Sequence, residues 1–301
     1  MNKFIMLVGL PASGKSTVGK ELSQELNATI HSSDSLREEL FGNINEVSKN
    51  NELFTELHRR IKNDLSSNKN VIYDATNISY KKRKSFIENL NKIPCQKVCY
   101  LIATPYEQCL KQNQLRERKV PDYVVEKMYK QIYIPQMYEG WDEINIIWNV
   151  DHTFDTHILF NGENGLNKIN QDNPNHTLTI GHHCLKCMQL CEEMLDDFEL
   201  NMATLYHDIG KRFTKQFKNS KGEDTDIAHY YQHHLVSAYD SLFYLKKLEK
   251  ESILDITNYI QWHMQPFFIK SDKTRDKFIR LVGQEFYNKL MILHEADKNA
   301  K

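Results

Sequence analysis

The sequence predicts two domains of different class: an α/β domain with a parallel sheet flanked by helices, followed by an all-α domain. In the first half, short β-rich apolar runs alternate with amphipathic helical stretches, as they do in parallel α/β folds. From Thr177 onward the strand signals end, and apolar residues recur at spacings of three and four, which is typical of a helical bundle. Eleven of the 13 histidines follow residue 150, which indicates a different chemistry in the second half.

The composition is that of a soluble globular protein. The 301 residues are 40% hydrophobic and 26% charged, with a formal net charge of −1, which is ordinary for two folded domains. Such a balance excludes a global basic field, so a nucleic-acid partner would be held by local patches. No apolar run reaches the roughly 18 residues that cross a bilayer, and the cysteines follow no disulfide spacing. We therefore expect a cytoplasmic protein with reduced thiols and no membrane partner.

The α/β domain is expected over residues 1–152. Its opening run reads as a buried first strand, because no small-residue cleavage site follows it. The expected strands are Phe4–Val8, Ala28–His31, Val71–Asp74, Val98–Ala103 and Ile144–Val150. The clearest amphipathic helices between them are Thr17–Leu26, Glu52–Leu65 and Ser79–Leu90.

Residues 153–175 are rich in Asn, Asp and Gly and have little apolar periodicity, so they are predicted to be a linker. The all-α domain is expected over residues 176–301. Its helical periods run through Leu178–Leu195, Ile227–Leu245, Ile253–Trp262 and Gln284–His294.

The segment GLPASGKST at residues 9–17 fits the phosphate-binding P-loop pattern G-x-x-x-x-G-K-[ST] in full. Its glycines let backbone amides turn toward phosphate oxygens, and the helix that follows adds its positive end. Lys15 is expected to reach the β/γ-phosphates and Ser16 to bind Mg²⁺. The segment predicts binding of ATP or GTP with Mg²⁺ through Gly9, Ser13, Gly14, Lys15, Ser16 and Thr17.

A kinase also needs a base near the acceptor hydroxyl and cations over the transferred group. Asp34 follows the second strand and is either that base or the N-cap of a helix over Leu36–Phe41; the two roles can coexist. Asp74-Ala-Thr-Asn77 ends the third strand in the same way and is a candidate for orienting metal or acceptor. A basic run before Pro121 is either a closing lid or a solvated face, and Arg116 is the residue chosen from Lys111, Arg116, Arg118 and Lys119.

These strings, with SSDSLR, VIYDATN and LRERKVP, make residues 3 to about 150 resemble the kinase domain of phage-type polynucleotide 5′-kinases. The resemblance implies that Asp34 is the general base for a 5′-hydroxyl, that Arg37 contacts an acceptor phosphate and that Arg116 touches ATP. One position departs from the family. Its acidic residue falls on Ala75, so that role passes to Asp74 or is lost. Small-metabolite kinases share the DATN string, which leaves the acceptor open.

Histidine and aspartate residues of the second half are spaced as if separate helices brought them to one point. His207 and Asp208 are adjacent, where a helix turns, and four further His and Asp residues lie on flanking helical periods. Imidazole with carboxylate suits a Mn, Fe, Co or Zn ion. The candidate metal ligands are His183, His207, Asp208, His233, His263 and Asp297.

Other residues of this half could imitate a metal site. Cys184, Cys187 and Cys191 suggest zinc, but they lie on one helix face without a fourth cysteine, so we assign them to the core. His182 and His234 abut candidate ligands and are expected at the surface or behind the site. His176 is left open as a substrate contact.

The series NHTLTIGHH, LYHDIGK, YYQHHLVSA, IQWHM and LHEAD makes residues 176–301 resemble the HD phosphohydrolase superfamily, close to the HD domain of bacterial tRNA nucleotidyltransferases. The resemblance implies a core metal site of His183, His207, Asp208 and Asp297, with Mn²⁺ or another divalent transition metal. His233 and His263 would complete a second metal site or bind phosphate, and Lys211 would meet a phosphate oxygen. The implied activity is phosphomonoester or 2′,3′-cyclic phosphodiester hydrolysis.

Together the two halves predict a bifunctional enzyme that heals broken polynucleotide ends, with RNA favoured over DNA as partner and a separate ligase acting downstream. One alternative is a nucleotide or metabolite kinase fused to a nucleotide phosphohydrolase. In another, the P-loop senses ATP and gates the HD site. The near-zero net charge favours a small substrate, whereas the basic runs Lys81–Lys84 and Lys111–Lys119 favour nucleic acid.

Overall fold

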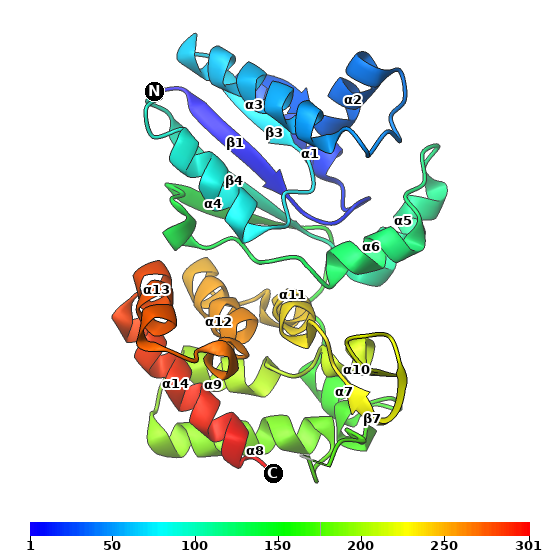
Figure 1. Ribbon diagram of the computed structural model, residues 1–301, viewed down its shortest axis with the longest axis vertical. Helices are drawn as coiled ribbons and strands as arrows, with labels where there is room; N and C mark the ends of the chain where they lie inside the picture. The colour runs from blue at the N-terminus through cyan, green and yellow to red at the C-terminus, as the bar shows by residue number, and fades with distance from the viewer. Residues whose placement is uncertain (175) are drawn as a thin grey trace. The chain divides into compact units, whose positions relative to one another are not determined.

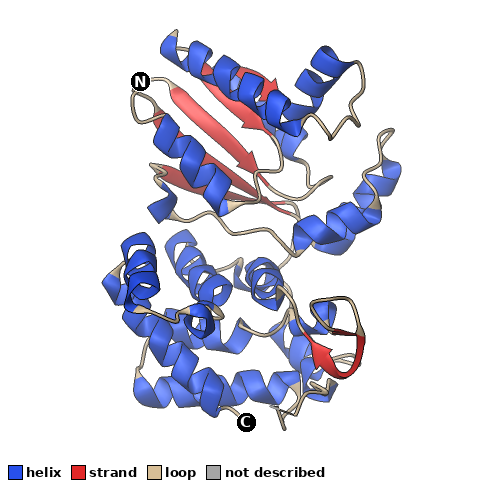
Figure 2. Cartoon of the chain, viewed as in Figure 1, coloured by secondary structure: helices blue, strands red, loops and turns tan. Residues whose placement is uncertain are grey.

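The computed structural model describes residues 1–174 and 176–301, which form two compact units (Figure 1). The first unit comprises Met1–Met128 and Pro135–Asp151, and the second comprises Tyr129–Ile134 and His152–Lys301. The first contains a parallel sheet with flanking helices and the second is mostly helical, which confirms the predicted fold class (Figure 2). None of the helices in these residues has the length and apolar character needed to cross a membrane.

The sheet of the first unit has the strand order β2-β3-β1-β4-β5, and each neighbouring pair is parallel. All the predicted strands are confirmed, with ends that differ by at most two residues. The central strand β1 continues into the P-loop, and its neighbours end beside it, so that side chains after several strands reach the same edge. The strands are β1 Lys3–Val8, β2 Ala28–Ser32, β3 Asn70–Asp74, β4 Gln96–Ala103 and β5 Glu143–Trp148.

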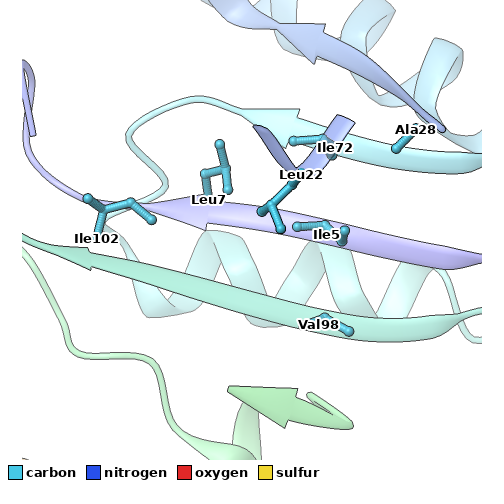
Figure 3. Close-up of a cluster of buried hydrophobic side chains, with 7 residues drawn as sticks. All are labelled: Ile5, Leu7, Leu22, Ala28, Ile72, Val98 and Ile102. Carbon is cyan, nitrogen blue, oxygen red and sulfur yellow. The ribbon is translucent and has the colours of Figure 1, made fainter. Parts of the chain in front are cut away.

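Helices connect these strands and cover the sheet. A cluster of buried apolar side chains from β1, β3 and β4 packs against Leu22 of the first helix (Figure 3). Because both faces of the sheet are covered at its centre, strands β1, β3 and β4 are almost continuously buried rather than alternating. The helices are α1 Lys15–Leu26, α2 Ser33–Phe41, α3 Asn50–Ser66, α4 Tyr80–Asn89, α5 Tyr106–Leu115 and α6 Asp122–Tyr129, with a 3₁₀ turn, η1, at Met137–Glu139.

One residue of the basic run Lys81–Lys84 has a structural role. Arg83 is 1% exposed, and two of its guanidinium nitrogens donate to the carboxylate of Glu139 at 2.7 and 2.6 Å. Glu139 also accepts from the Trp141 indole at 3.2 Å. The pair therefore joins α4 to the segment that returns to β5. Arg83 is not available to a polyanion, which weakens the interpretation of this run as a nucleic-acid patch.

The second unit is built from helices that pack around a buried histidine cluster. Its long helices confirm the predicted periods over Leu178–Leu195, Ile253–Trp262 and Gln284–His294 to within a few residues. The helices of this unit are α7 Thr156–Asn161, α8 Ile180–Met194, α9 Phe198–Tyr206, α10 Lys211–Thr214, α11 His233–Leu245, α12 Lys250–Trp262, α13 Asp272–Val282 and α14 Gln284–Asn299, with 3₁₀ turns η2 Leu166–Lys168 and η3 Gln265–Phe268.

A β-hairpin interrupts the predicted helices. Strands β6, Gln216–Lys218, and β7, Asp224–His229, pair antiparallel. The expectation that Ile227–Leu245 is one helix is therefore wrong for its first six residues, since α11 begins at His233. Ala228 is the sole residue of the two strands that is buried. Without an apolar face, neither strand shows the alternation by which strands are recognised.

Two segments pack onto the second unit from outside its predicted bounds. Tyr129 donates its hydroxyl to Asp240 at 2.5 Å, and the Ile134 amide donates to Gln261 at 3.0 Å. The segment predicted as a linker contains α7 and η2, and the Phe154 amide donates to the Phe243 carbonyl at 2.9 Å. Residues 129–134 thus belong to the helical unit, although they lie in sequence within the α/β half.

The Arg83–Glu139 pair gives a stability prediction. Replacing Arg83 by Ala leaves a buried carboxylate without its cation, which should lower the free energy of unfolding of the first unit by about 3–5 kcal/mol. Urea denaturation followed by tryptophan fluorescence measures the change. The exposed neighbour Lys82 is the matched control, and K82A should shift stability by less than about 0.5 kcal/mol. A loss below about 1 kcal/mol for R83A would contradict the assigned role.

Candidate active sites

The P-loop connects β1 to α1 with a strained backbone. Ala12 and Gly14 have φ angles of 58° and 93°, in the left-handed region that glycine tolerates best. At Gly9 an added Cβ would lie 2.8 Å from Ser13 Oγ and 3.0 Å from the Ile102 carbonyl, so only glycine fits. The loop is also held by Thr104, whose hydroxyl donates to the Ser13 carbonyl at 2.8 Å.

The predicted nucleotide-binding residues converge at the start of α1. Lys15 is buried, and its Nζ donates to the Leu10 carbonyl at 2.6 Å, inside the loop. Burial lowers the pKa of Lys15, although the carboxylate of Asp74 partly offsets this effect. Ser16 and Thr17, the first residues after Lys15, remain exposed at the helix N-terminus, where backbone amides and the helix dipole favour an anion.

The carboxylate of Asp74 lies opposite the P-loop serine. Ser16 Oγ donates to Asp74 Oδ2 at 2.9 Å, which joins the end of β3 to the start of α1. Asp74, and not the neighbouring Ala75, therefore occupies the acidic position beside the loop. Asn77 has a structural role, since its side-chain amide donates to the backbone carbonyl of Leu7 at 2.9 Å. A hydroxyl and a carboxylate at this spacing are oxygen ligands of the kind that Mg²⁺ takes.

Asp34 is not the N-cap of α2. The cap is Ser32, whose hydroxyl accepts from the amides of Asp34 and Ser35 at 3.3 and 3.4 Å. The Asp34 carboxylate is therefore free to make other contacts. Its Oδ1 accepts from Arg37 at 3.0 Å, and its Oδ2 lies 2.6 Å from Arg118. At 43% exposure, this carboxylate is accessible from solvent at the edge of the sheet.

The basic run before Pro121 contributes Arg118 to Asp34, a contact that the sequence did not predict, whereas the arginine chosen from this run, Arg116, was expected to touch ATP. Arg118 pairs with Asp34 and also donates to Asn45 and the Ile44 carbonyl, each at 3.1 Å. Arg116 is exposed at the end of α5, and its charge influences the phosphate-binding residues. Burial is the largest influence on the pKa of Lys15 and of Asp74, lowering the first and raising the second, and the charge of Arg116 lowers both.

The histidine cluster of the second unit forms where α9 turns into α10. His207 caps α9 and Asp208 lies in the turn. Gly210 allows this turn to lie against α11, because a Cβ there would come within 2.5 Å of the His233 carbonyl and 2.7 Å of the Ser237 amide. The Gly210 amide donates to Ser237 Oγ at 2.8 Å. Glycine is therefore needed at position 210 of the HDIG string, because a side chain there would clash with α11.

The structure brings all the predicted metal ligands together. The first group is His183, His207, Asp208 and Asp297, and the second is Asp208, His233 and His263; within each group one ligand atom per residue lies within 4.8 Å of the others. His183 Nε2 lies 3.3 Å from Asp208 Oδ2 and 3.1 Å from Asp297 Oδ1. His233 Nε2 lies 3.1 Å from Asp208 Oδ1. Asp208 therefore belongs to both groups.

Each of the cluster histidines is oriented by a backbone carbonyl. Nδ1 of His183, His207, His233 and His263 lies 2.6–2.7 Å from the carbonyl oxygens of Ala300, Thr204, Tyr230 and Ile260, respectively. A carbonyl only accepts, so Nδ1 carries a hydrogen, and in the neutral ring, the form that binds a metal, Nε2 presents a lone pair to the centre. This is the arrangement that metal-binding histidines require.

Two polar atoms at the centre of the histidine cluster are placed as expected for ligands of a cation. His207 Nε2 and Asp208 Oδ1 are buried and make no hydrogen bond. His233 Nε2 and His263 Nε2 face each other at 3.1 Å, and two lone pairs at that distance repel unless a proton or a metal ion lies near them. Buried polar atoms are normally paired. The donor set of imidazoles and carboxylates fits a divalent transition metal.

The charges of the cluster compensate one another. Burial would lower the pKa of His183, but hydrogen bonds with Asp208 and Asp297 outweigh it and raise that pKa to about 9. Burial would raise the pKa of Asp208, yet the charges of His207 and Lys211 hold it well below its ordinary value. The carboxylates therefore stay ionised, which is the form that binds a metal.

Lys211 is held within the cluster itself. Its Nζ lies 2.6 Å from Asp208 Oδ2 and donates to Gln171 Oε1 at 2.7 Å, and the residue is 5% exposed. The predicted contact with a phosphate oxygen remains a prediction. Among the open residues, His176 packs edge-on against His183 with ring centroids 5.2 Å apart, which places it beside the first metal group.

The neighbouring histidines and the cysteines, which were not assigned as metal ligands, lie outside the two metal groups. His182 is exposed and lies within 2.9 Å of the Thr179 hydroxyl. His234 lies behind the cluster, with its ring centroid 6.2 Å from that of His263. Cys184, Cys187 and Cys191 are buried thiols along α8, as expected of core residues.

Comparison with known protein families agrees with the division of the chain into an α/β unit and a helical unit. Residues 4–135 match a family model described as an AAA domain, and residues 180–300 match the HD domain model. The chain therefore carries a P-loop nucleotide-binding domain followed by an HD domain.

Among curated proteins, the chain is 25% identical over 244 residues to the L-seryl-tRNA(Sec) kinase of Methanococcus maripaludis, which covers 74% of this chain and 93% of that protein. Among solved structures it is similar to a chain of the Pnkp1/Rnl/Hen1 RNA repair complex, with 23% identity, 43% of each chain covered and a TM-score of 0.40. It is also similar to a gluconokinase from Sinorhizobium meliloti, with 16% identity, 50% of this chain and 83% of that chain covered and a TM-score of 0.38.

The adjacent histidines 182 and 183 provide a test of the metal groups. H183A removes one imidazole from the first group and should weaken Mn²⁺ binding at least tenfold, whereas H182A, one residue away and exposed, should leave it unchanged. Isothermal titration of the metal-free protein with Mn²⁺ measures the affinity, and circular dichroism checks that both variants fold. Equal affinities for the two variants would show that His183 is not a ligand.

Proposed function

We propose that this chain is a bifunctional enzyme that heals nucleic-acid ends: an ATP-dependent 5′-hydroxyl polynucleotide kinase joined to a metal-dependent 2′,3′-cyclic phosphodiesterase and phosphatase. The observation that carries the proposal is that one chain holds both chemistries. A carboxylate, Asp34, stands beside a P-loop, and a cluster of imidazoles and carboxylates fills the HD domain. A broken RNA carries a 5′-hydroxyl at one end and a 2′,3′-cyclic phosphate at the other, so it needs both activities before ligation.

In the proposed kinase reaction, the P-loop amides and Lys15 hold the phosphates of ATP, and Ser16 and Asp74 supply oxygens for Mg²⁺. Asp34 takes the proton from the acceptor hydroxyl. Its two arginine partners hold the carboxylate in place, and its exposed side leaves room for a strand end. Arg116, whose charge acts on Lys15 and Asp74, neutralises charge on the transferred phosphoryl group.

In the proposed hydrolase reaction, the HD cluster holds one or two divalent ions. A bound ion of this kind lowers the pKa of a coordinated water and polarises a phosphoryl oxygen. The protein contributes four imidazoles fixed by carbonyls and two carboxylates that, despite their burial, are held ionised by the neighbouring charges and hydrogen bonds. Lys211 fixes the Asp208 carboxylate in its orientation toward both groups.

An acceptor hydroxyl carried on RNA is favoured by the curated relative. Its printed name gives a seryl group on tRNA as the acceptor, and the similarity extends over 74% of this chain. Transfer to a seryl-tRNA is accordingly the second candidate for the kinase half, and a small metabolite is the third. ATP and GTP are both open as donors, because the P-loop contacts phosphates rather than the base.

The two activities should be separable by single substitutions. D34N should lower 5′-phosphorylation at least about 100-fold by removing the base and leave hydrolysis unchanged. D208N, which alters both metal groups, should do the reverse. The assay uses RNA with 5′-hydroxyl and 2′,3′-cyclic phosphate ends, γ-labelled ATP, Mg²⁺ and Mn²⁺, with both ends analysed by gel electrophoresis. Each variant serves as the folding control for the other.

The same assay can reject the proposal. If the unaltered protein changes neither end of the RNA, the end-healing function is wrong. If it labels seryl-tRNA or a free nucleoside faster than the 5′-hydroxyl RNA, the acceptor is wrong while the kinase mechanism stands. Full labelling by D34N would exclude Asp34 as the base.

The two arginines of the lid should affect different substrates. R118A removes the guanidinium that lies 2.6 Å from Asp34, so it should raise KM for the acceptor about tenfold and leave KM for ATP within about twofold. R116A should do the opposite, because its charge acts at Lys15 and Asp74. Initial rates at varied acceptor and ATP give both constants, with exposed K119A as control. Identical profiles for R116A and R118A would refute this division.

A further inference from the structure

A surface beside the HD cluster combines exposed aromatic rings with unpaired basic side chains. It follows directly after the cluster residue His263 and extends along η3 and α13. We call it the η3–α13 surface. Its members are Phe267, Phe268, Lys270, Lys273, Lys277 and Arg280. Figure 1 shows α13 beside α14, the helix that carries Asp297.

The aromatic part lies next to two metal-group residues. Phe267 and Phe268 are 47% and 63% exposed, and η3 begins two residues after His263. The Phe267 ring packs edge-on against His294 with centroids 4.5 Å apart. His294 precedes Asp297 by three residues on α14, hence by less than one helical turn. Phe267 therefore packs on α14 within one helical turn of Asp297, and both rings follow His263 closely in the chain.

The basic part forms one stripe of α13. Lys273, Lys277 and Arg280 are spaced i, i+4 and i+7, which places them on a common face. That face is turned away from Phe278, which is buried against Trp262 at 5.2 Å. Lys270 and the three stripe residues are exposed, and among residues 1–174 and 176–301 no carboxylate lies within 4.0 Å of their cationic groups.

Neighbouring Arg275 shows the contrast. It pairs with Asp272 at 2.9 Å and with Asp276 at 3.4 Å. The acidic residues of α13 are thus satisfied by an arginine outside the stripe, and the stripe itself keeps its full positive charge. A protein with a net charge of −1 therefore concentrates unpaired cations next to a cluster suited to phosphate chemistry.

We propose that the η3–α13 surface binds the single strand of nucleic acid whose phosphate-bearing end enters the HD cluster, an inference that rests on the proposed hydrolase function. Lys270 and the stripe contact successive backbone phosphates, and Phe267 and Phe268 stack on the terminal bases. Single strands are bound in this way, by cations along the backbone with aromatic rings for the bases. A lipid surface or an acidic protein would use the cations but has no need of stacking rings beside the metal groups.

The test compares binding and hydrolysis in full-length variants. K273A/K277A/R280A should weaken binding of a fluorescent 12-nucleotide RNA with a 3′-phosphate at least tenfold. It should also lower the slope of log Kd against log salt by about 2, because each lost phosphate contact on a single strand contributes about 0.7. The control, K168A/K221A/K247A, removes the same charge from exposed lysines of the same unit. F268A should weaken binding about tenfold, with exposed F198A as its control.

Hydrolysis separates this surface from the metal groups. The stripe variant and F268A should raise KM for the RNA and leave the rate on bis(p-nitrophenyl) phosphate, which has no strand, unchanged. If the stripe variant and its control bind RNA equally, the inference is overturned. It is overturned as well if the stripe variant loses binding to anionic phospholipid vesicles but not to RNA. Failure of the unaltered protein to hydrolyse either substrate would instead overturn the proposed function, since strand binding is measured separately.

Discussion

The carboxylate of Asp208 is the group around which the second unit is built. It is 2% exposed, and it lies within 4.0 Å of four imidazoles and of Lys211. A buried carboxylate is costly unless cations and donors surround it. Here they come from α8, α9, α11 and α12, and α14 adds Asp297. The helices must therefore converge at this point, and the carbonyl that orients each histidine ties the ring to the backbone of its own or another element.

The candidate kinase base, Asp34, differs from Asp208 because its carboxylate is exposed to solvent. Asp34 is 43% exposed, and its ion pairs with Arg37 and Arg118 reach it from α2 and from the segment after α5. Ion pairs with a solvent-exposed partner contribute little to stability, so these arginines are better understood as holding the carboxylate in its orientation. In the reactions we propose, an acceptor hydroxyl approaches Asp34 from solvent, whereas the HD cluster admits only a phosphate. The difference in burial between the two sites is consistent with these two roles.

Local spacing predicted much of this structure, and long-range pairing explains most of what it missed. The P-loop and the HDIG turn are short strings whose chemistry requires particular residues in order, so both could be identified without coordinates. The central strands were recognisable because they are almost continuously apolar. No partner of Asp34 was predicted from the basic run before Pro121, because its residues look alike in the sequence and only the fold brings Arg118 to α2. The β6–β7 hairpin was missed because its strands bury almost nothing, and its pairing depends on backbone hydrogen bonds that leave no pattern in the sequence.

The basic side chains show why net charge says little about partners. Two basic runs look alike in the sequence, but the fold uses their arginines differently. Arg83 forms a buried pair with Glu139, and Arg118 pairs with Asp34. On α13, the stripe of Lys273, Lys277 and Arg280 pairs with no carboxylate in the described residues, and Arg275 pairs with the nearby Asp272 and Asp276. A near-neutral chain can therefore present a local positive field wherever basic side chains have no acidic partner. A polyanion responds to these unpaired charges rather than to the net charge of the chain.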